Sequence, residues 1–242
     1  MKKINIETAE NLAYKFRFKN GISESEAINT KSILRKLNII TAYRPLSEKS
    51  YGLSLIGPNG IYFILVNSNT TRGRQHFTIA HELYHIFFDE NPKPHICSDG
   101  VSDVAEINAN LFASALLLPK AGLIEFLSNE EIKHKNVEIA TIIKMEQYFS
   151  VSRQSILFRL KRLGYISEVV LQDLLKIPAA ESARNYGYDT SLYGTGNKNL
   201  FIGDFGEKAR KLYDMEKISE GRYMEILNMI GNVKGGNKND EN

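Results

Sequence analysis

The chain has 242 residues, of which 43% are hydrophobic and 24% are charged, and its formal net charge is +3. These values are typical of a soluble globular protein with one large or two small domains, and the near-neutral charge argues against a globally basic nucleic-acid binder. One cysteine excludes an intrachain disulfide framework, and the absence of a signal-peptide core or a membrane-length apolar run predicts a cytoplasmic, soluble protein.

The first third of the chain predicts two helices and a small sheet. Helical spacing of apolar residues marks residues 5–18 and about 24–37. Three strand-like runs follow, at residues 39–43, 51–56 and 61–67.

A strong turn sequence, Gly57-Pro58-Asn59-Gly60, separates the last two strand-like runs. These runs should therefore pair as an antiparallel hairpin. If one strand lies at the edge of a cleft, it can bind an extended polypeptide through main-chain hydrogen bonds, with little demand on side-chain identity.

Residues 74–88 predict a helix that is apolar nearly all round and therefore buried, and they contain the pattern His-Glu-Leu-Tyr-His. Residues i and i+4 share one helix face, with Cβ atoms roughly 5–6 Å apart, so His81 and His85 can bind one ion. Zinc accepts neutral imidazole, and a catalytic zinc site keeps one position for water. Glu82 can then act as the base for that water.

The polar residues of this helix fall on one line, because Thr78, His81, Glu82 and His85 stand at i, i+3, i+4 and i+7. In an alternative interpretation, the two histidines are core residues bonded to carbonyl groups and the glutamate lies at the surface. That interpretation does not explain a single polar stripe on an apolar helix. Because buried polar groups need partners, the stripe favours a metal site.

A break at Asn91-Pro92-Lys93-Pro94 ends this region and predicts a loop. His95 and Cys97 in that loop are capable of binding metal, and either one is an alternative ligand. An isolated histidine or cysteine in a loop is more often unliganded, and a better third ligand follows.

That ligand lies in a second apolar helix, which is predicted at residues 103–119 with Ser102 or Asp103 as its cap and Pro119 at its end. Glu106 can reach a metal if the two helices approach closely. Small side chains favour such an approach, and they recur on one side of the helix at Ala105, Ala109 and Ala113.

Asn110, one turn beyond Glu106, can orient a ligating imidazole. Asp103 is the competing carboxylate. A solvated Glu106 on an amphipathic helix is the weaker alternative, because the apolar content of the helix implies burial on most faces.

The stretch from Arg74 to His85, followed by Glu-Ile-Asn-Ala-Asn at 106–110 and Leu-Leu-Leu-Pro at 116–119, resembles the ImmA/IrrE family of metallopeptidases. The resemblance covers the hairpin, both helices and the helical region after them. It implies a zincin-like catalytic domain in which His81, His85 and Glu106 bind zinc and Glu82 is the catalytic base.

The arrangement of Glu106 and Asn110 is also similar to the Glu-x-x-x-Asp of thermolysin-like zincins, with an amide in place of the carboxylate. Two positions depart from the ImmA/IrrE pattern. Tyr84 stands where the family often has glycine, and His76 stands where it often has arginine. Neither departure removes a ligand.

Family members typically lie beside a helix-turn-helix repressor in phages, mobile elements or stress regulons, and they relieve repression by cleaving it. The resemblance therefore implies an endopeptidase with a DNA-binding repressor as its protein substrate. An alternative is a non-proteolytic, antitoxin-like regulatory protein that binds DNA or a partner and holds a structural metal. Tyr84, His76 and His95 are candidate donors to a tetrahedral intermediate.

Residues 139–149 and 152–164 predict a helix, a tight turn and a capped second helix, which is the pattern of a helix-turn-helix. In a DNA-binding interpretation the second helix would direct these side chains at DNA: Arg153, Gln154, Arg159, Lys161 and Arg162. We favour packing against the catalytic part, because base contacts require an exposed helix and the total charge is near neutral. DNA binding remains the alternative.

The expected fold class is α+β and mainly helical, with a small antiparallel sheet and an active-site helix. We expect a metallopeptidase domain at 1–135, the helix-turn-helix-like region at 136–178 and a helical extension at 179–230. That extension contains two helices, at 204–215 and 219–230, and a disordered tail follows at 231–242. Gly194-x-Gly196 lacks the strand-and-helix context of a nucleotide site and is expected to be a loop.

Overall fold

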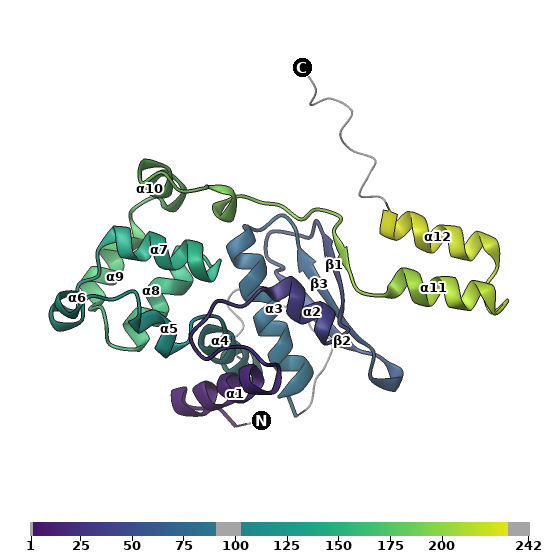
Figure 1. Cartoon of the computed structure of the whole chain (residues 1–242), viewed down its shortest axis with the longest axis horizontal. Helices are drawn as coiled ribbons and strands as arrows, with labels where there is room; N and C mark the ends of the chain where they lie inside the picture. The colour runs from purple at the N-terminus through teal and green to yellow at the C-terminus, as the bar shows by residue number, and fades with distance from the viewer. Residues whose placement is uncertain (1, 91–102, 232–242) are drawn as a thin grey trace, which may run out of the picture.

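A four-stranded mixed sheet lies at the centre of the computed structural model, which describes residues 2–90 and 103–231 (Figure 1). Its strand order is β2-β3-β1-β4. The strands are β1 (Ile40–Arg44), β2 (Gly52–Ile56), β3 (Tyr62–Asn67) and β4 (Phe201–Ile202).

The strand pairing differs in part from the antiparallel sheet expected from the sequence. β2 and β3 do pair antiparallel, as the turn at residues 57–60 predicted. However, β1 pairs parallel to β3, with Ile40 opposite Phe63, and antiparallel to β4. The prediction was wrong for the whole sheet because the stretch after β1 carries the chain to the far edge, so that β3 returns beside β1 in the same direction.

Helix α3 (Arg72–Phe87) packs against β2 and β3 on one side and against α4 (Val104–Leu117) on the other. Thr71 caps α3, because its side chain accepts a hydrogen bond from the backbone N–H of Arg74. α1 (Ile6–Lys19) covers α4 in turn. The helix predicted to carry the histidines is therefore enclosed between the sheet and a second helix.

The second helix of the chain is shorter than expected. α2 covers Thr30–Lys36 instead of residues 24–37, because Asn29 starts it by accepting a hydrogen bond from the backbone N–H of Ser32. Ala27 and Ile28 still pack against the core, but from outside the helix. Their apolar character was the misleading signal.

In the described residues after α4, the regular elements are helices apart from β4. The helices are α5 (Lys120–Ile124), α6 (Asn129–His134), α7 (Ile139–Phe149), α8 (Arg153–Arg162), α9 (Glu168–Leu175), α10 (Ala179–Asn185), α11 (Phe205–Asp214) and α12 (Glu220–Gly231), with short 3-10 turns η1 (Pro58–Gly60) and η2 (Ser191–Tyr193). Figure 1 shows α5–α9 on one side of α3 and the sheet, and the α11–α12 hairpin projecting from the other side. Among the described residues, no helix is both long and apolar enough to cross a lipid bilayer.

The predicted helix-turn-helix pattern corresponds to α7 and α8. Two of the basic residues considered for DNA contact are buried in it. Arg153 forms a salt bridge with Glu146, and Arg159 forms one with Glu10. The exposed residues of α8 are Gln154, Phe158, Lys161 and Arg162. The two buried arginines therefore fix α8 to its own protein.

Candidate metal centre

The polar stripe predicted on α3 is buried. His81, Glu82 and His85 expose 5%, 0% and 2% of their surfaces, respectively. The helix is otherwise packed by apolar side chains, of which Ile79 and Leu83 are examples. The three polar side chains are thus held where an unsatisfied polar group would be costly.

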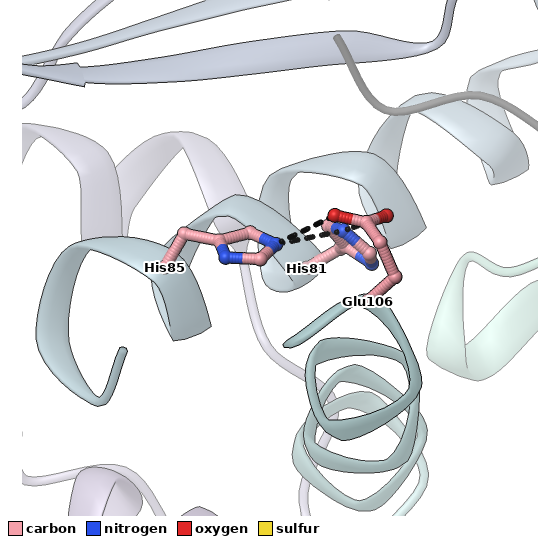
Figure 2. Close-up of side chains that lie close together, drawn as sticks. All are labelled: His81, His85 and Glu106. Carbon is pink, nitrogen blue, oxygen red and sulfur yellow. Dashed lines mark hydrogen bonds and ion pairs between the residues drawn. The ribbon is translucent and has the colours of Figure 1, made fainter. Parts of the chain in front are cut away.

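Helix α4 brings Glu106 to the two histidines (Figure 2). One carboxylate oxygen of Glu106 lies 3.3 Å from His81 Nε2, and the other lies 3.3 Å from His85 Nε2. The two Nε2 atoms are 3.1 Å apart. Ala109 and Ala113 are fully buried, as expected where two helices approach closely. The three residues thus form a buried group whose ligand atoms all lie within 4.8 Å of one another.

The other ring nitrogen of each histidine has an oxygen partner. Asn110 Oδ1 lies 3.0 Å from His81 Nδ1, in agreement with the role predicted for Asn110. Asp89 Oδ2 lies 3.0 Å from His85 Nδ1. Asp89 was not predicted as a partner, although its position one helical turn after His85 indicates that the two side chains can meet.

These contacts show that the group fits a metal ion. Assigned from the hydrogen-bond pattern, each Nδ1 carries the proton and each Nε2 presents a lone pair. Two lone pairs and a carboxylate that face one another at 3.1–3.3 Å in a buried site repel unless a cation lies among them. Imidazole nitrogens and a carboxylate are a common ligand set for divalent transition metals.

Glu82 lies where strand β2 comes closest to α3. A Cβ atom added at Gly52, the first residue of β2, would lie 2.6 Å from Leu65 O, 2.6 Å from Thr78 Cγ2 and 3.6 Å from Glu82 Oε1. The backbone of β2 can approach the helix this closely only because residue 52 has no side chain. Glu82 is therefore enclosed between the group of His81, His85 and Glu106 and the edge of the sheet.

Two candidate donors to a tetrahedral intermediate, Tyr84 and His76, make other contacts. Tyr84 is buried against Phe112 and its hydroxyl hydrogen-bonds Asn108, while burial raises its pKa. His76 Nδ1 lies 2.7 Å from the carbonyl oxygen of Ser150. Both polar groups serve local packing, which argues against a role for either as a donor to the substrate.

Three expectations cannot be placed. His95 and Cys97 lie outside the described residues, as do residues 232–242 of the tail expected at 231–242, whereas Gly231 is the last residue of α12. Asp103, the competing carboxylate, is the N-cap of α4 and accepts a hydrogen bond from the backbone N–H of Ala105. Of the two carboxylates considered in this region, Glu106 is the one at the histidines.

The part of the chain that contains His81, His85 and Glu106 is similar to a known protein family. The model of the IrrE N-terminal-like domain matches residues 34–161, just over half of the chain. This chain belongs to the ImmA/IrrE metallopeptidase family. The matched residues include β1–β3, helices α3 and α4, and α7 and α8 up to residue 161.

A relative from Bacillus subtilis (strain 168), named Uncharacterized protein YqaB, is 28% identical over 156 residues. The similarity covers 64% of this chain and 87% of that protein. The ImmA/IrrE family implies a metallopeptidase, and the buried His81, His85 and Glu106 group is a plausible metal site for one.

Proposed function

We propose that this protein is a zinc-dependent endopeptidase. The observation that carries the proposal is the buried meeting of His81, His85 and Glu106 with Glu82 next to the first histidine on the same helix. A purely structural metal would not need a further buried carboxylate beside its ligands. Family membership supports the same activity.

A zinc ion held by His81, His85 and Glu106 would supply a Lewis acid for a water molecule and for the scissile carbonyl. The Glu82 carboxylate accepts a proton as water oxygen adds to the carbonyl carbon. It then delivers that proton to the amine nitrogen as the C–N bond breaks. Asn110 and Asp89 hold the two imidazoles in the tautomer that presents Nε2.

Strand β2 offers an edge for an extended substrate. Asn67 N–H donates to Tyr51 O, and Gly57 N–H donates to Ile61 O, so the odd-numbered residues of β2 face β3. The main-chain groups of Gly52, Ser54 and Ile56 therefore point the other way. In the described part of the chain no strand pairs with that edge.

We propose that a polypeptide adds to this edge by main-chain hydrogen bonds. Because Gly52 brings the edge to Glu82, a chain paired there would run past the catalytic group. Binding of this kind makes little demand on side-chain identity and suits a protein substrate.

The proposed substrate is a helix-turn-helix repressor, and its cleavage would relieve repression in a phage, mobile element or stress regulon. Family resemblance supports this part of the proposal. The test is to incubate the purified protein and zinc with the repressor encoded nearest to its gene, with and without a chelator, and to map the fragments by mass. We expect cleavage at a defined bond that the chelator abolishes.

Intact repressor that co-purifies with the protein would contradict the peptidase proposal and favour a non-proteolytic, antitoxin-like role. Cleavage that survives the chelator would contradict the role of the metal. A catalytically inactive control, Glu82→Gln, excludes a contaminating protease.

A further inference from the structure

A segment far away in sequence crosses the N-terminal end of α3, the helix that carries His81 and His85. Residues 189–202, here called the strap, run from η2 to β4 and lie beyond the residues 34–161 that match the family model. Figure 1 shows this segment passing over the end of α3 on its way to β1.

Backbone contacts join the strap to the first turn of α3. The backbone N–H of Arg72 donates to Gly194 O at 2.9 Å, and Arg72 Nη1 donates to Ser191 O at 3.0 Å. Thr71 and Thr195 form an isolated antiparallel bridge. The strap thereby satisfies groups at a helix end, where backbone N–H groups have no intrahelical partner.

The side chain of Gln75, which is fully buried, connects α3 to the strap a second time. Its Nε2 donates to Gly196 O at 3.0 Å, and its Oε1 accepts from Asn197 Nδ2 at 2.8 Å. Lys31 Nζ donates to Asn197 Oδ1 at 3.1 Å. A hydrogen-bonded chain thus runs from α2 through the strap to the metal helix.

The same turn of α3 also contacts the α7–α8 connection. A Cβ atom added at Gly73 would lie 2.7 Å from the backbone nitrogen of Ser152, so α3 and this connection are in direct contact. The strap is anchored to the same helical region, because Tyr193 Oη donates to Glu146 at 2.7 Å. The first turn of α3 therefore contacts both the strap and the α7–α8 connection, and the strap is itself bonded to α7.

We propose that the strap positions the metal helix, with Gln75 and Asn197 as positioning residues, so that the seated strap slows release of the bound metal. A helix transmits a shift at its first turn to the residues beyond it, and His81 lies only six residues after Gln75. Much of the strap's attachment to α3 is polar, so it can open without global unfolding. The proposal rests on metal binding at His81, His85 and Glu106.

The test compares Asn197→Gly with Asn199→Gly. Both asparagines lie in the strap with left-handed backbones, at φ 59° and 62°, which glycine adopts without strain. Asn197 connects Gln75 to Lys31, whereas no side-chain hydrogen bond is recorded for Asn199 in the described structure. Gln75→Leu is a second variant, which removes the connection from the side of the helix together with the hydrogen bonds from Gln75 Nε2 to Ser68 O and Thr70 O.

Zinc release to a chromophoric chelator, the visible spectrum of the cobalt(II) form and the thermal unfolding of the metal-free protein are measured for each variant. We expect Asn197→Gly and Gln75→Leu to release zinc faster than the wild type, by at most the roughly tenfold effect of removing a residue that hydrogen-bonds a metal ligand directly. The cobalt spectrum should change in both. Asn199→Gly should match the wild type.

Wild-type release rates in both Asn197→Gly and Gln75→Leu would overturn the proposal. The proposal would also be overturned if Asn199→Gly released zinc as fast as Asn197→Gly. It would likewise be overturned if release were faster only in proportion to a lower stability of the metal-free protein, because the strap would then be merely structural. A wild type that binds zinc but cleaves nothing would contradict the proposed peptidase and leave the metal-release comparison intact.

Discussion

The two imidazoles of the candidate metal site have chemically different oxygen partners, a carboxylate at His85 and an amide at His81. A carboxylate partner makes an imidazole more basic and fixes its tautomer, whereas an amide oxygen mainly fixes the tautomer. The two ligands should therefore depend on their partners to different degrees.

We predict that Asp89→Ala weakens zinc binding by roughly 10–100-fold, since His85 loses its partner while the three ligands remain. Asp89→Asn should lose less, because its amide oxygen can still accept from Nδ1. Competition with a zinc chelator of known affinity measures both. Equal affinity in wild type and Asp89→Ala would show that Asp89 does not support the ligand.

The sequence predicted most of the side chains that the structure brings together at the candidate site. His81, Glu82 and His85 followed from helical spacing, and Glu106 and Asn110 from an apolar helix with few carboxylates to choose from. Asp89 was missed because it follows the apolar run and looks like a helix-end charge. Only the folded α3 places its carboxylate, largely buried, beside His85.

Strand β2 and helix α3 meet at a position that admits no side chain. We predict that Gly52→Ala destabilises the protein by roughly 1–3 kcal/mol, the usual cost of overpacking, because its Cβ would collide with Leu65 O. Gly57→Ala, at the other end of the strand, is the control, since its Cβ would meet neighbours only at 3.4 Å or more. Urea denaturation distinguishes them, and equal midpoints would contradict the close approach.

His76 links α3 to the α7–α8 connection and gives this contact a pH dependence. Burial lowers the pKa of His76 below its ordinary value near 6.5, with Lys31 and Arg72 acting in the same direction. The unfolded chain therefore takes up a proton at His76 before the folded one does. Stability from a neutral His76 is present above pH 6.5 and is lost as the pH falls below it.

We predict that the stability difference between wild type and His76→Gln falls as the pH is lowered from 7.5 to 5. Glutamine can also donate to Ser150 O but does not titrate. All other titratable groups are the same in the two proteins. Chemical denaturation of the metal-free proteins at several pH values measures the difference. A difference that stays constant would show that His76 titrates alike in both states.

Helices and strands were predicted well where the local sequence determines their structure, and less well where contacts with distant segments determine it. The hairpin, α3, α4, α7 and α8 followed from local turns, caps and periodicity. β4 was not predicted, because two residues give no strand pattern and pair only since β1 offers a free edge. The parallel β1–β3 pairing depends likewise on long-range packing.

Across the whole molecule, the helical region and the strap meet at a buried ion pair. Glu146 accepts from Arg153 Nε at 2.6 Å and from Tyr193 Oη at 2.7 Å. Arg153 also donates to Ser182 on α10. The fully buried Glu146 carboxylate thus joins α7, α8 and the strap, and Tyr193 lies 47 positions after Glu146 in the sequence.

We predict that Glu146→Ala destabilises the protein by about 3–5 kcal/mol, because it leaves the Arg153 charge buried without its partner. Asp214→Ala, which breaks an exposed pair with Arg210, should change stability by less than about 1 kcal/mol. Thermal and urea unfolding compare the two. A small loss in Glu146→Ala would show that Arg153 finds another partner and that the region is not fixed as described.

The most direct measurement determines zinc content and repressor cleavage in the same preparations of wild type and Glu82→Gln. Glutamine keeps the shape of the side chain and the three ligands but does not accept the proton of water. We predict about one zinc per chain in both proteins and cleavage by the wild type alone. Cleavage by Glu82→Gln at the wild-type rate, or a wild type that binds no metal, would contradict a catalytic centre built from His81, Glu82, His85 and Glu106.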